Sequence, residues 1–287
     1  MPQHTIRGSL RKAKRWLKNK KPTGVLPGAD GFLYSWINEQ LVDMVEDGLR
    51  TSYKPYAWGM LQGALLGAGL GLKRVSAVEF GVAGGNGLVA MEDIADRIEK
   101  LVNVKIDIYG FDSGVGLPAP TDYRDIPNLC SSGLYAMDEG KLRKRLHRSK
   151  LILGDIKNTI GEFVGSNPAP LSFIACDFVL YTSTTHGLKI LDAAEAAVLP
   201  RVHCYFDDVL GFTYSDYNGE RLAIHEFNAA HQTRKISPIF GLKYYVPKQF
   251  SNEMWVDKFW IGHLFDHSKY GHRDLLVQGH NLELVIK

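Results

Sequence analysis

The sequence predicts a doubly wound, mostly parallel α/β sheet that follows an N-terminal helical extension. From residue 74 onward, short runs of branched and aromatic residues alternate with stretches of helical periodicity. The runs are apolar at successive positions, which is typical of strands buried on both faces of a parallel sheet. Several of the runs also end on an acidic residue. The predicted strands are residues 74–82, 104–112, 150–155, 171–177 and 201–208.

A basic leader, residues 1–21, precedes these elements. It holds eight of the 34 Lys and Arg residues and no acid, which leaves 26 basic residues against 31 acidic ones in the rest of the chain. Ile6, Leu10, Ala13 and Leu17 fall on one helical stripe, so the leader could lie on an anionic membrane surface or on a partner. A solvated, partly disordered leader is the alternative. The mildly acidic remainder gives no footprint for nucleic acid.

Residues 22–73 form the expected helical extension, and residues 74–287 form a single α/β domain. The stretch 55–73 is apolar, but it contains five glycines and barely reaches the length of a membrane span, so we expect a buried helix there. Residues 234–265 hold further β-like runs that could add edge strands. A helix is predicted between the first two strands, where apolar residues recur at helical spacing: Leu88, Met91, Ile94, Ala95 and Ile98.

The cysteine content predicts a location. Cys130, Cys176 and Cys204 are too few and too scattered for a disulfide framework, which favours a reducing cytoplasm. Two of them, Cys176 and Cys204, lie inside apolar strand-like runs and are interpreted as small core residues. A homo-oligomer is left open.

Acidic residues stand where the predicted strands end. In a doubly wound sheet the carboxyl ends of the strands form the ligand-binding edge. Each acid alone could be a helix cap or a solvated loop residue, but together they predict a binding site on this edge. They are Glu79, Asp112, Asp155, Asp177, Asp207 and Asp208.

The loop after the first strand, within VEFGVAGGNGL (78–88), is rich in glycine, which lets a backbone turn tightly and approach a ligand. Residues 85–90 fit the G-x-G-x-x-A dinucleotide fingerprint, with Asp112 near the expected ribose position. However, Glu79 would repel a pyrophosphate, whereas it would attract the amino group and sulfonium of S-adenosylmethionine. The sign of this charge therefore favours S-adenosylmethionine over NAD(P).

Five segments resemble successive motifs of class I S-adenosylmethionine-dependent methyltransferases with a Rossmann-like fold. Within that group the sequence is most similar to the macrocin O-methyltransferase family of sugar-modifying enzymes. DSGVGLP resembles that family's DSFEGLP-type segment, and YTST resembles its YEST-type segment. The resemblance covers roughly residues 75–232. The segments are VEFGVAGGNG, GFDSGVGLP, LGDIKNT, CDFVLYTST and YFDD.

The resemblance implies roles for residues on the cofactor side. Glu79, Gly81 and Gly85 would form the loop around the methionine part. Asp112 would accept hydrogen bonds from the ribose hydroxyls, and Ser113 would assist near the ribose. Asp155 would lie beside the adenine, although a turn residue after Gly154 is an equal alternative.

The resemblance also implies a divalent metal. Asp177, Asp207 and Asp208 would lie together, and oxygen ligands of this kind suit Mg²⁺. Such a metal would bind the acceptor hydroxyl, lower its pKa and orient it for attack on the methyl group. One departure bears on this: the family's D-x-D-x-Y motif reads Asp-Phe-Val-Leu-Tyr here, so Val179 replaces one carboxylate. Mg²⁺ is therefore an option rather than a requirement.

The reaction also needs a group that accepts the proton of the acceptor. Asp208 is one candidate, and His186 and His225 lie on segments expected to face the pocket. The resulting hypothesis is an O-methyltransferase acting on a small hydroxylated acceptor, such as a sugar or a glycosylated metabolite. An NAD(P)-dependent oxidoreductase and a non-catalytic, cofactor-binding relative are the alternatives. The polar, proline-broken segment 118–140 is expected to form a lid over the cofactor.

Overall fold

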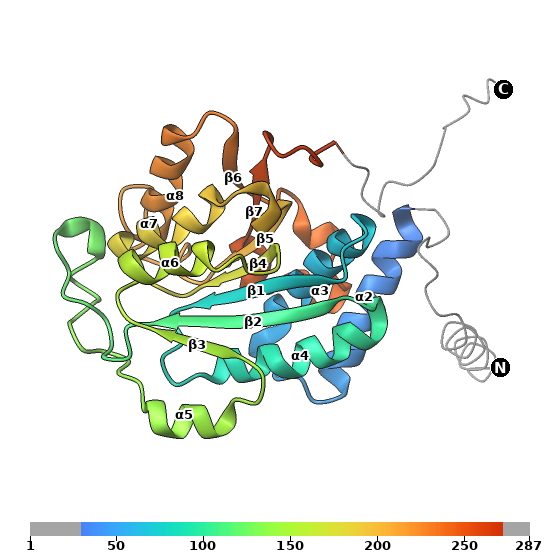
Figure 1. Cartoon of the computed structure of the whole chain (residues 1–287), viewed down its shortest axis with the longest axis horizontal. Helices are drawn as coiled ribbons and strands as arrows, with labels where there is room; N and C mark the ends of the chain where they lie inside the picture. Colours follow the sequence, from blue (N-terminus) through green and yellow to red (C-terminus); the bar gives the residue numbers. More distant parts are fainter. Residues whose placement is uncertain (1–29, 272–287) are drawn as a thin grey trace.

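The computed structural model describes residues 30–271, which form a three-layer α/β unit around one seven-stranded sheet (Figure 1). The strand order is β3-β2-β1-β4-β5-β7-β6. The first five strands pair in parallel, whereas β7 runs antiparallel to both β5 and β6. The strands are β1 (Arg74–Phe80), β2 (Lys105–Asp112), β3 (Lys150–Leu153), β4 (Leu171–Cys176), β5 (Val198–Phe206), β6 (Arg234–Pro238) and β7 (Phe259–Leu264).

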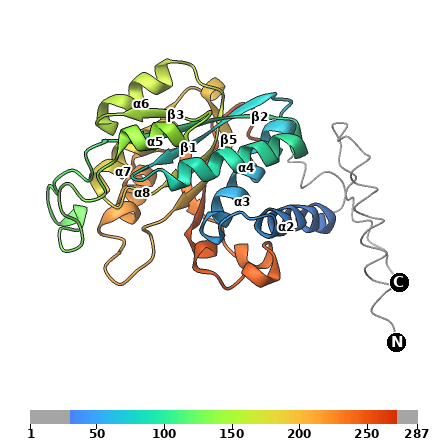
Figure 2. The same ribbon diagram turned by 90° about the horizontal axis from the view of Figure 1, so that it is seen from below.

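Helices cover both faces of the sheet, and each face has its own hydrophobic core. One group of helices packs on the face that lies behind the sheet in Figure 1 and below it in Figure 2. It consists of α2 (Asp30–Glu46), α3 (Lys54–Gly69) and α4 (Asn86–Val102). The opposite face carries α6 (Ile156–Gly165), α7 (Tyr181–Gly187) and α8 (Gly219–Ala230). The short α5 (Glu139–Arg145) precedes β3.

Short 3₁₀ helices occupy many of the connections. They are η1 (Thr51–Tyr53), η2 (Tyr123–Asp125), η3 (Leu188–Asp192), η4 (Glu195–Ala197), η5 (Leu242–Tyr244), η6 (Lys248–Phe250) and η7 (Met254–Lys258).

The fold class predicted from the sequence is confirmed. All five predicted parallel strands are present, although the fifth begins earlier than predicted, at Val198. The predicted helix between the first two strands is α4, and residues 234–265 contribute the two edge-side strands β6 and β7. The leader, residues 1–21, lies outside the described residues. Within residues 30–271, no helix combines the length and the apolar character that a membrane crossing requires.

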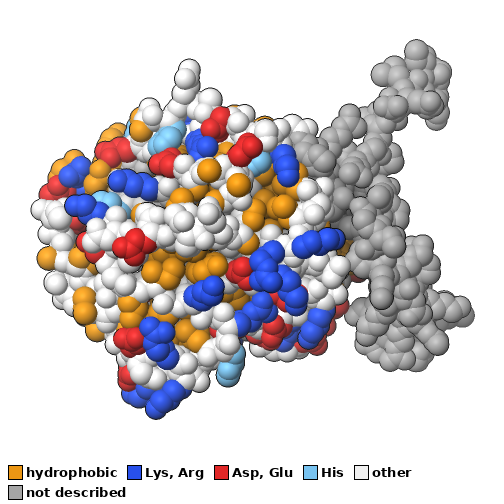
Figure 3. All heavy atoms as spheres, viewed as in Figure 1, with side chains coloured by type: hydrophobic (Ala, Val, Ile, Leu, Met, Phe, Trp, Pro, Cys, Tyr) orange, Lys and Arg blue, Asp and Glu red, His pale blue; other side chains and the backbone are white. Residues whose placement is uncertain are grey.

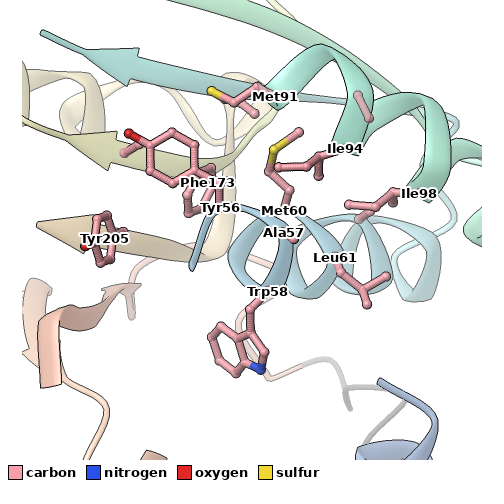
Figure 4. Close-up of a cluster of buried hydrophobic side chains, with 14 of the residues drawn as sticks. Tyr56, Ala57, Trp58, Met60, Leu61, Met91, Ile94, Ile98, Phe173 and Tyr205 are labelled. Atoms are coloured by element: carbon pink, nitrogen blue, oxygen red, sulfur yellow. The ribbon is translucent and has the colours of Figure 1, made fainter. Parts of the chain in front are cut away.

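A stripe of glycines lets helix α3 lie directly on the sheet. A Cβ atom at Gly59 would lie 2.3 Å from the Phe173 ring, and one at Gly63 would lie 2.8 Å from Ser172 Cβ, both on β4. Gly67 approaches Val75 of β1 in the same way. The glycines of the 55–73 stretch therefore serve close helix-to-sheet packing. Figure 4 shows the side of α3 that carries Met60 and Leu61 packed toward Ile94 and Ile98 of α4.

We predict that Gly63→Ala lowers the free energy of unfolding by about 1–3 kcal/mol, because the new methyl group would collide with the backbone of β4. Gly161→Ala is the matched control, since Gly161 lies in α6 with open space around it, and it should raise stability by about 0.5–1 kcal/mol. Urea unfolding measures both changes. Equal effects of the two substitutions would contradict the close-packing explanation.

Candidate active site

A cavity of about 930 Å³ opens at the carboxyl ends of β1, β2, β4 and β5. Residues that follow these strands supply its floor, and the segment after β2 supplies part of its wall. Most of the sequence-predicted site residues line it. Those that do are Gly81, Asp112, Ser113, Asp155, Asp177, His186, Asp207 and Asp208.

A second cavity, of about 690 Å³, lies by β2, β3 and α6 and includes Arg74, Asp107 and Glu162. It lies away from the carboxyl ends of the strands and contains none of the predicted site residues. The site is therefore placed in the larger cavity.

On the face seen in Figure 3, Lys and Arg side chains are interspersed with Asp and Glu.

The loop between β1 and α4 depends on glycine at two of the predicted positions. Gly81 has φ +82°, and a Cβ atom there would lie 2.1 Å from the Asp177 carbonyl oxygen. Gly85 has φ +74°, and its Cβ would lie 2.0 Å from Leu142 of α5. Both glycines are thus required by the backbone. Gly81 lines the cavity, whereas Gly85 contacts α5 and lies outside the lining.

Asp112 organises the same loop from the end of β2. Its Oδ2 accepts hydrogen bonds from the backbone N–H groups of Val82 and Ala83, both at 2.9 Å, and its Oδ1 accepts one from Gly114 at 2.7 Å. These bonds support Ala83, whose φ of +45° is uncommon for a residue with a side chain. A carboxylate has about four acceptor positions, so Asp112 keeps capacity for a ligand hydroxyl.

Ser113 and Asp155 line the cavity while stabilising local turns. The Ser113 hydroxyl donates to the Gly116 carbonyl at 2.7 Å. Asp155 caps α6 by accepting a hydrogen bond from the Lys157 N–H at 2.9 Å. The contacts of Asp155 within the protein are therefore those of a local turn and helix cap. Because Asp155 also lines the cavity, it is available to a ligand as well.

Glu79 lies behind the loop rather than in the cavity lining. Its side chain is buried between β1, α3 and α4, and its Oε1 accepts a hydrogen bond from the Tyr56 hydroxyl at 3.0 Å. Gly87 makes room for it, since a Cβ at that position would lie 1.8 Å from Oε1. Oε2 is buried without a hydrogen-bond partner. This placement does not agree with the prediction that Glu79 contacts a cationic ligand directly.

Burial raises the pKa of the Glu79 carboxyl to about 8. The hydrogen bonds from Tyr56 and from the Leu88 N–H act in the opposite direction, while the charges of Asp177 and Asp112 raise the pKa further. Glu79 is thus an acid held largely protonated near neutral pH. Tyr56 and Gly87 were not predicted as its partners, because only the packing of α3 and α4 on β1 brings them together.

Three predicted carboxylates meet at the ends of β4 and β5. Asp177 lines the cavity, but the surrounding protein excludes much of the water around its carboxyl. This loss of hydration, together with the charges of Asp208 and Asp207, raises the pKa of the Asp177 carboxyl to about 7. Burial also raises the pKa of Asp208, against the lowering effect of a hydrogen bond that its Oδ1 accepts from the Tyr214 hydroxyl at 2.7 Å. Sequence reasoning therefore placed this cluster correctly.

A fourth carboxyl group, Glu220, was missed. It lies at the start of α8 with no exposed surface, and its Oε2 accepts a hydrogen bond from the Asp208 N–H at 3.0 Å. Burial, followed by the charge of Asp208, raises its pKa well above the usual value. The sequence around it, GERLAIHEFN, carries no strand-end signal that would have identified it.

The donor set does not fit the predicted metal. Asp207 Oδ1 already accepts hydrogen bonds from the Tyr205 hydroxyl at 2.7 Å and from Lys258 Nζ at 2.8 Å. Across residues 30–271, no group of three or more His, Cys, Asp and Glu side chains is arranged to hold a metal ion. Val179 lines the cavity with a left-handed φ of +61°, and its apolar side chain cannot bind a metal. Magnesium therefore has no support in this site.

The two predicted histidines differ. His186 lines the cavity, and its Nδ1 lies 2.7 Å from the Thr182 carbonyl oxygen. Because a carbonyl can only accept, Nδ1 carries the hydrogen, and in the neutral ring Nε2 keeps a lone pair that can take a proton. His225 lies exposed on α8 and outside the lining, so the prediction that it faces the cavity is wrong. The helix turns that side chain toward solvent.

The segment after β2 forms part of the cavity wall, while the prediction that residues 118–140 form a lid over the cofactor stays a prediction. Asp125 of η2 anchors this segment to α7, because its carboxylate accepts hydrogen bonds from Thr121 and from both the N–H and the hydroxyl of Thr182. Its contribution to the lining is mostly apolar: Val115, Gly116, Leu117, Pro118, Leu129, Cys130 and Tyr135. The segment thus places an apolar wall opposite the carboxylates.

The sheet order, with the antiparallel β7 between β5 and β6, is that of the Rossmann-like fold of class I S-adenosylmethionine-dependent methyltransferases. The chain is similar to the crystal structure of CalS11, a calicheamicin methyltransferase, with a TM-score of 0.50 and 19% identity over 84% of this chain and 91% of that one. No protein-family model and no curated protein matches the sequence.

Two further solved structures are similar at a lower level. The apo structure of CalS11, described as a TDP-rhamnose 3′-O-methyltransferase, has a TM-score of 0.42 and 17% identity over 84% of this chain and 92% of that one. The O-methyltransferase TomG from Streptomyces achromogenes, in complex with S-adenosylmethionine, has a TM-score of 0.38 and 12% identity over 92% of this chain and 99% of that one.

We predict that Glu79 makes stability depend on pH. Because its pKa is raised from 4.5 to about 8, its stabilising contribution is complete below pH 4.5 and is lost as the pH rises toward 8. Glu79→Gln should flatten the pH profile of the unfolding free energy between about pH 5 and pH 9 by roughly 3 kcal/mol. The exposed Glu162→Gln serves as the control. Parallel profiles for wild type and Glu79→Gln would show that the carboxyl titrates normally.

Proposed function

We propose that the protein transfers a methyl group from S-adenosylmethionine to a hydroxyl group of a small acceptor, such as a sugar or a glycosylated metabolite. The observation that carries this proposal is the acidic cavity at the carboxyl edge of a sheet with methyltransferase strand order. S-adenosylmethionine supplies an activated methyl group on a positively charged sulfur. On the cofactor side of the cavity, Asp112 and Asp155 would repel the pyrophosphate of a dinucleotide, whereas a cation is favoured there.

The residues on the cavity floor fit this cofactor. Asp112 has unused acceptor positions for ribose hydroxyls and rigidly holds the adjacent loop. Gly81 and Ala83 present bare or nearly bare backbone to the cavity, and Ser113 and Asp155 lie alongside. Glu79 would act from behind the loop, by fixing α4 and α3 relative to β1.

The wall formed by the segment after β2 supports an acceptor with both polar and apolar parts. Leu129 and Tyr135 line the cavity with apolar surface, while Asp207, Asp208 and His186 offer hydrogen-bond partners. A sugar bearing an apolar substituent matches such a lining. CalS11, described as a TDP-rhamnose 3′-O-methyltransferase, is a fold neighbour whose acceptor is of the sugar class.

Asp208 is the proposed proton acceptor. Its Oδ1 accepts a hydrogen bond from the Tyr214 hydroxyl, its backbone N–H donates to Glu220, and its carboxyl group interacts with Asp177, so the side chain is fixed in the lining. A positioned carboxylate of raised pKa can take the hydroxyl proton as the oxygen attacks the methyl group. His186, with its Nε2 lone pair, is the second candidate.

A non-catalytic, cofactor-binding relative is kept as the second candidate function. It is favoured by Val179, which stands at the position of a carboxylate in the resembling family and lines the cavity. A cytoplasmic location is also proposed, and it is supported by the three cysteines, all of them buried and free of disulfides. Membrane contact through the leader and self-association likewise stay predictions.

S-adenosylhomocysteine, the expected product, should raise the melting temperature of the purified protein, whereas NAD⁺ and NADP⁺ should not. Asp112→Asn should weaken this ligand about 10-fold, because an amide nitrogen cannot accept the loop N–H groups. Asp107→Asn is the matched control at the opposite end of β2, where Asp107 pairs with Arg74. Stabilisation by NAD(P) alone would overturn the proposal.

Asp208→Asn should leave the affinity for S-adenosylhomocysteine within about 3-fold of wild type and lower methyl transfer by about 100-fold or more. His186→Gln should retain most activity. Radiolabelled methyl transfer from S-adenosylmethionine to a panel of nucleotide sugars and phenolic glycosides measures both. An inactive His186→Gln protein beside an active Asp208→Asn protein would make His186 the proton acceptor. Wild-type protein that binds S-adenosylhomocysteine but methylates no acceptor would favour the non-catalytic alternative.

A further inference from the structure

The carboxyl cluster at the ends of β4 and β5 needs positive charge, and the fold supplies it from Lys258, the last residue of η7. Lys258 Nζ lies 2.8 Å from Asp207 Oδ1, and the lysine side chain is 13% exposed. Asp177 and Asp208 interact electrostatically with the same lysine, and Glu220 lies beside Asp208. Gathered carboxylates are costly unless a cation or protonation neutralises them, so this lysine is placed where compensation is required.

The topology of β7 fixes the position of Lys258. β7 runs antiparallel to β5, and Phe259, its first residue, pairs with Tyr205 near the carboxyl end of β5. The residue just before β7 therefore lies beside Asp207. Trp255 and Val256 of η7 are buried in the core beneath the sheet and hold the approach to the strand. Lys258 is thus held in place by the paired strand β7 and the buried residues of η7 rather than by a mobile loop.

We propose that the Lys258 ammonium takes the place of a divalent cation at this cluster, so that the active site works without a bound metal. The inference rests on the proposed methyl transfer for its functional meaning. Asp207 Oδ1 is committed to Lys258 and Tyr205, and Asp208 Oδ1 to Tyr214. A metal would have to displace these donors, and Val179 offers no replacement ligand.

The proposal assigns Lys258 a positioning role. It lies outside the cavity lining and acts through Asp207, which does line the cavity. Its fixed charge holds Asp207 in one orientation and offsets repulsion between Asp207 and Asp208. The acceptor hydroxyl would then be bound by hydrogen bonds to carboxylates rather than by chelation to a metal. A single hydroxyl would suffice for this, whereas chelation uses two neighbouring oxygens.

The test is a metal titration of the metal-stripped, full-length protein, followed by thermal unfolding. Wild type should show no change in melting temperature with Mg²⁺ or Ca²⁺ up to about 10 mM. Lys258→Met should melt about 5 °C or more lower, because Asp207 loses its partner, and either ion should restore part of that loss. Lys258→Arg, which keeps the charge, should melt near wild type and ignore the metals.

Two controls separate this role from general packing. Lys258→Met combined with Asp207→Asn should regain stability and lose the response to metal, since both charges are gone. Lys248→Met, an exposed lysine in the same connection, should behave as wild type. Saturable metal binding by wild type below about 1 mM, or a Lys258→Met protein that is indifferent to metal, would overturn the inference. The shift with S-adenosylhomocysteine is measured separately, so failure of the proposed function would be recognised independently.

Discussion

The gathering of acidic groups at one edge of the sheet is the constraint on which this structure depends. Parallel strands direct their carboxyl ends to the same side, so each acid there must be compensated locally. Asp112 is compensated by backbone N–H groups and Asp155 by a helix N-terminus. Glu79 is compensated by protonation and Asp207 by Lys258. These different solutions leave a cavity that is acidic yet structurally stable, which suits a cationic ligand.

The second requirement is close packing behind that edge. Gly63 brings α3 against β4, and Gly87 brings the first turn of α4 against the end of β1. This approach encloses the Glu79 carboxyl beside the Tyr56 hydroxyl and excludes water from it. A larger residue at either glycine would force the helices outward and open the pocket around Glu79. The glycines near β1 therefore serve the packing of the loop as much as the approach of a ligand.

The sequence predicted the architecture because strand runs and helical periods are local patterns, and parallel topology then determines which residues share an edge. Asp177, Asp207 and Asp208 were brought together by that reasoning alone. Lys258 was not, because its position depends on β7 pairing antiparallel with β5, a long-range choice that no local pattern encodes. The predictions that Glu79 contacts the ligand and that His225 faces the cavity are wrong for the same reason. Which way a side chain of a strand or helix points depends on tertiary packing.

Val179 lies in the cavity lining with the carboxyl cluster. Its left-handed backbone is strained for a β-branched residue, at a cost on the order of 1–2 kcal/mol, whereas Asp or Asn tolerates this conformation better. The side chain at this strained position is apolar, so it adds no carboxylate to the cluster. The positive charge nearest to Asp207 is the Lys258 ammonium, 2.8 Å away. The apolar valine leaves the acidic groups without a further carboxylate, and the lysine supplies the cation beside them.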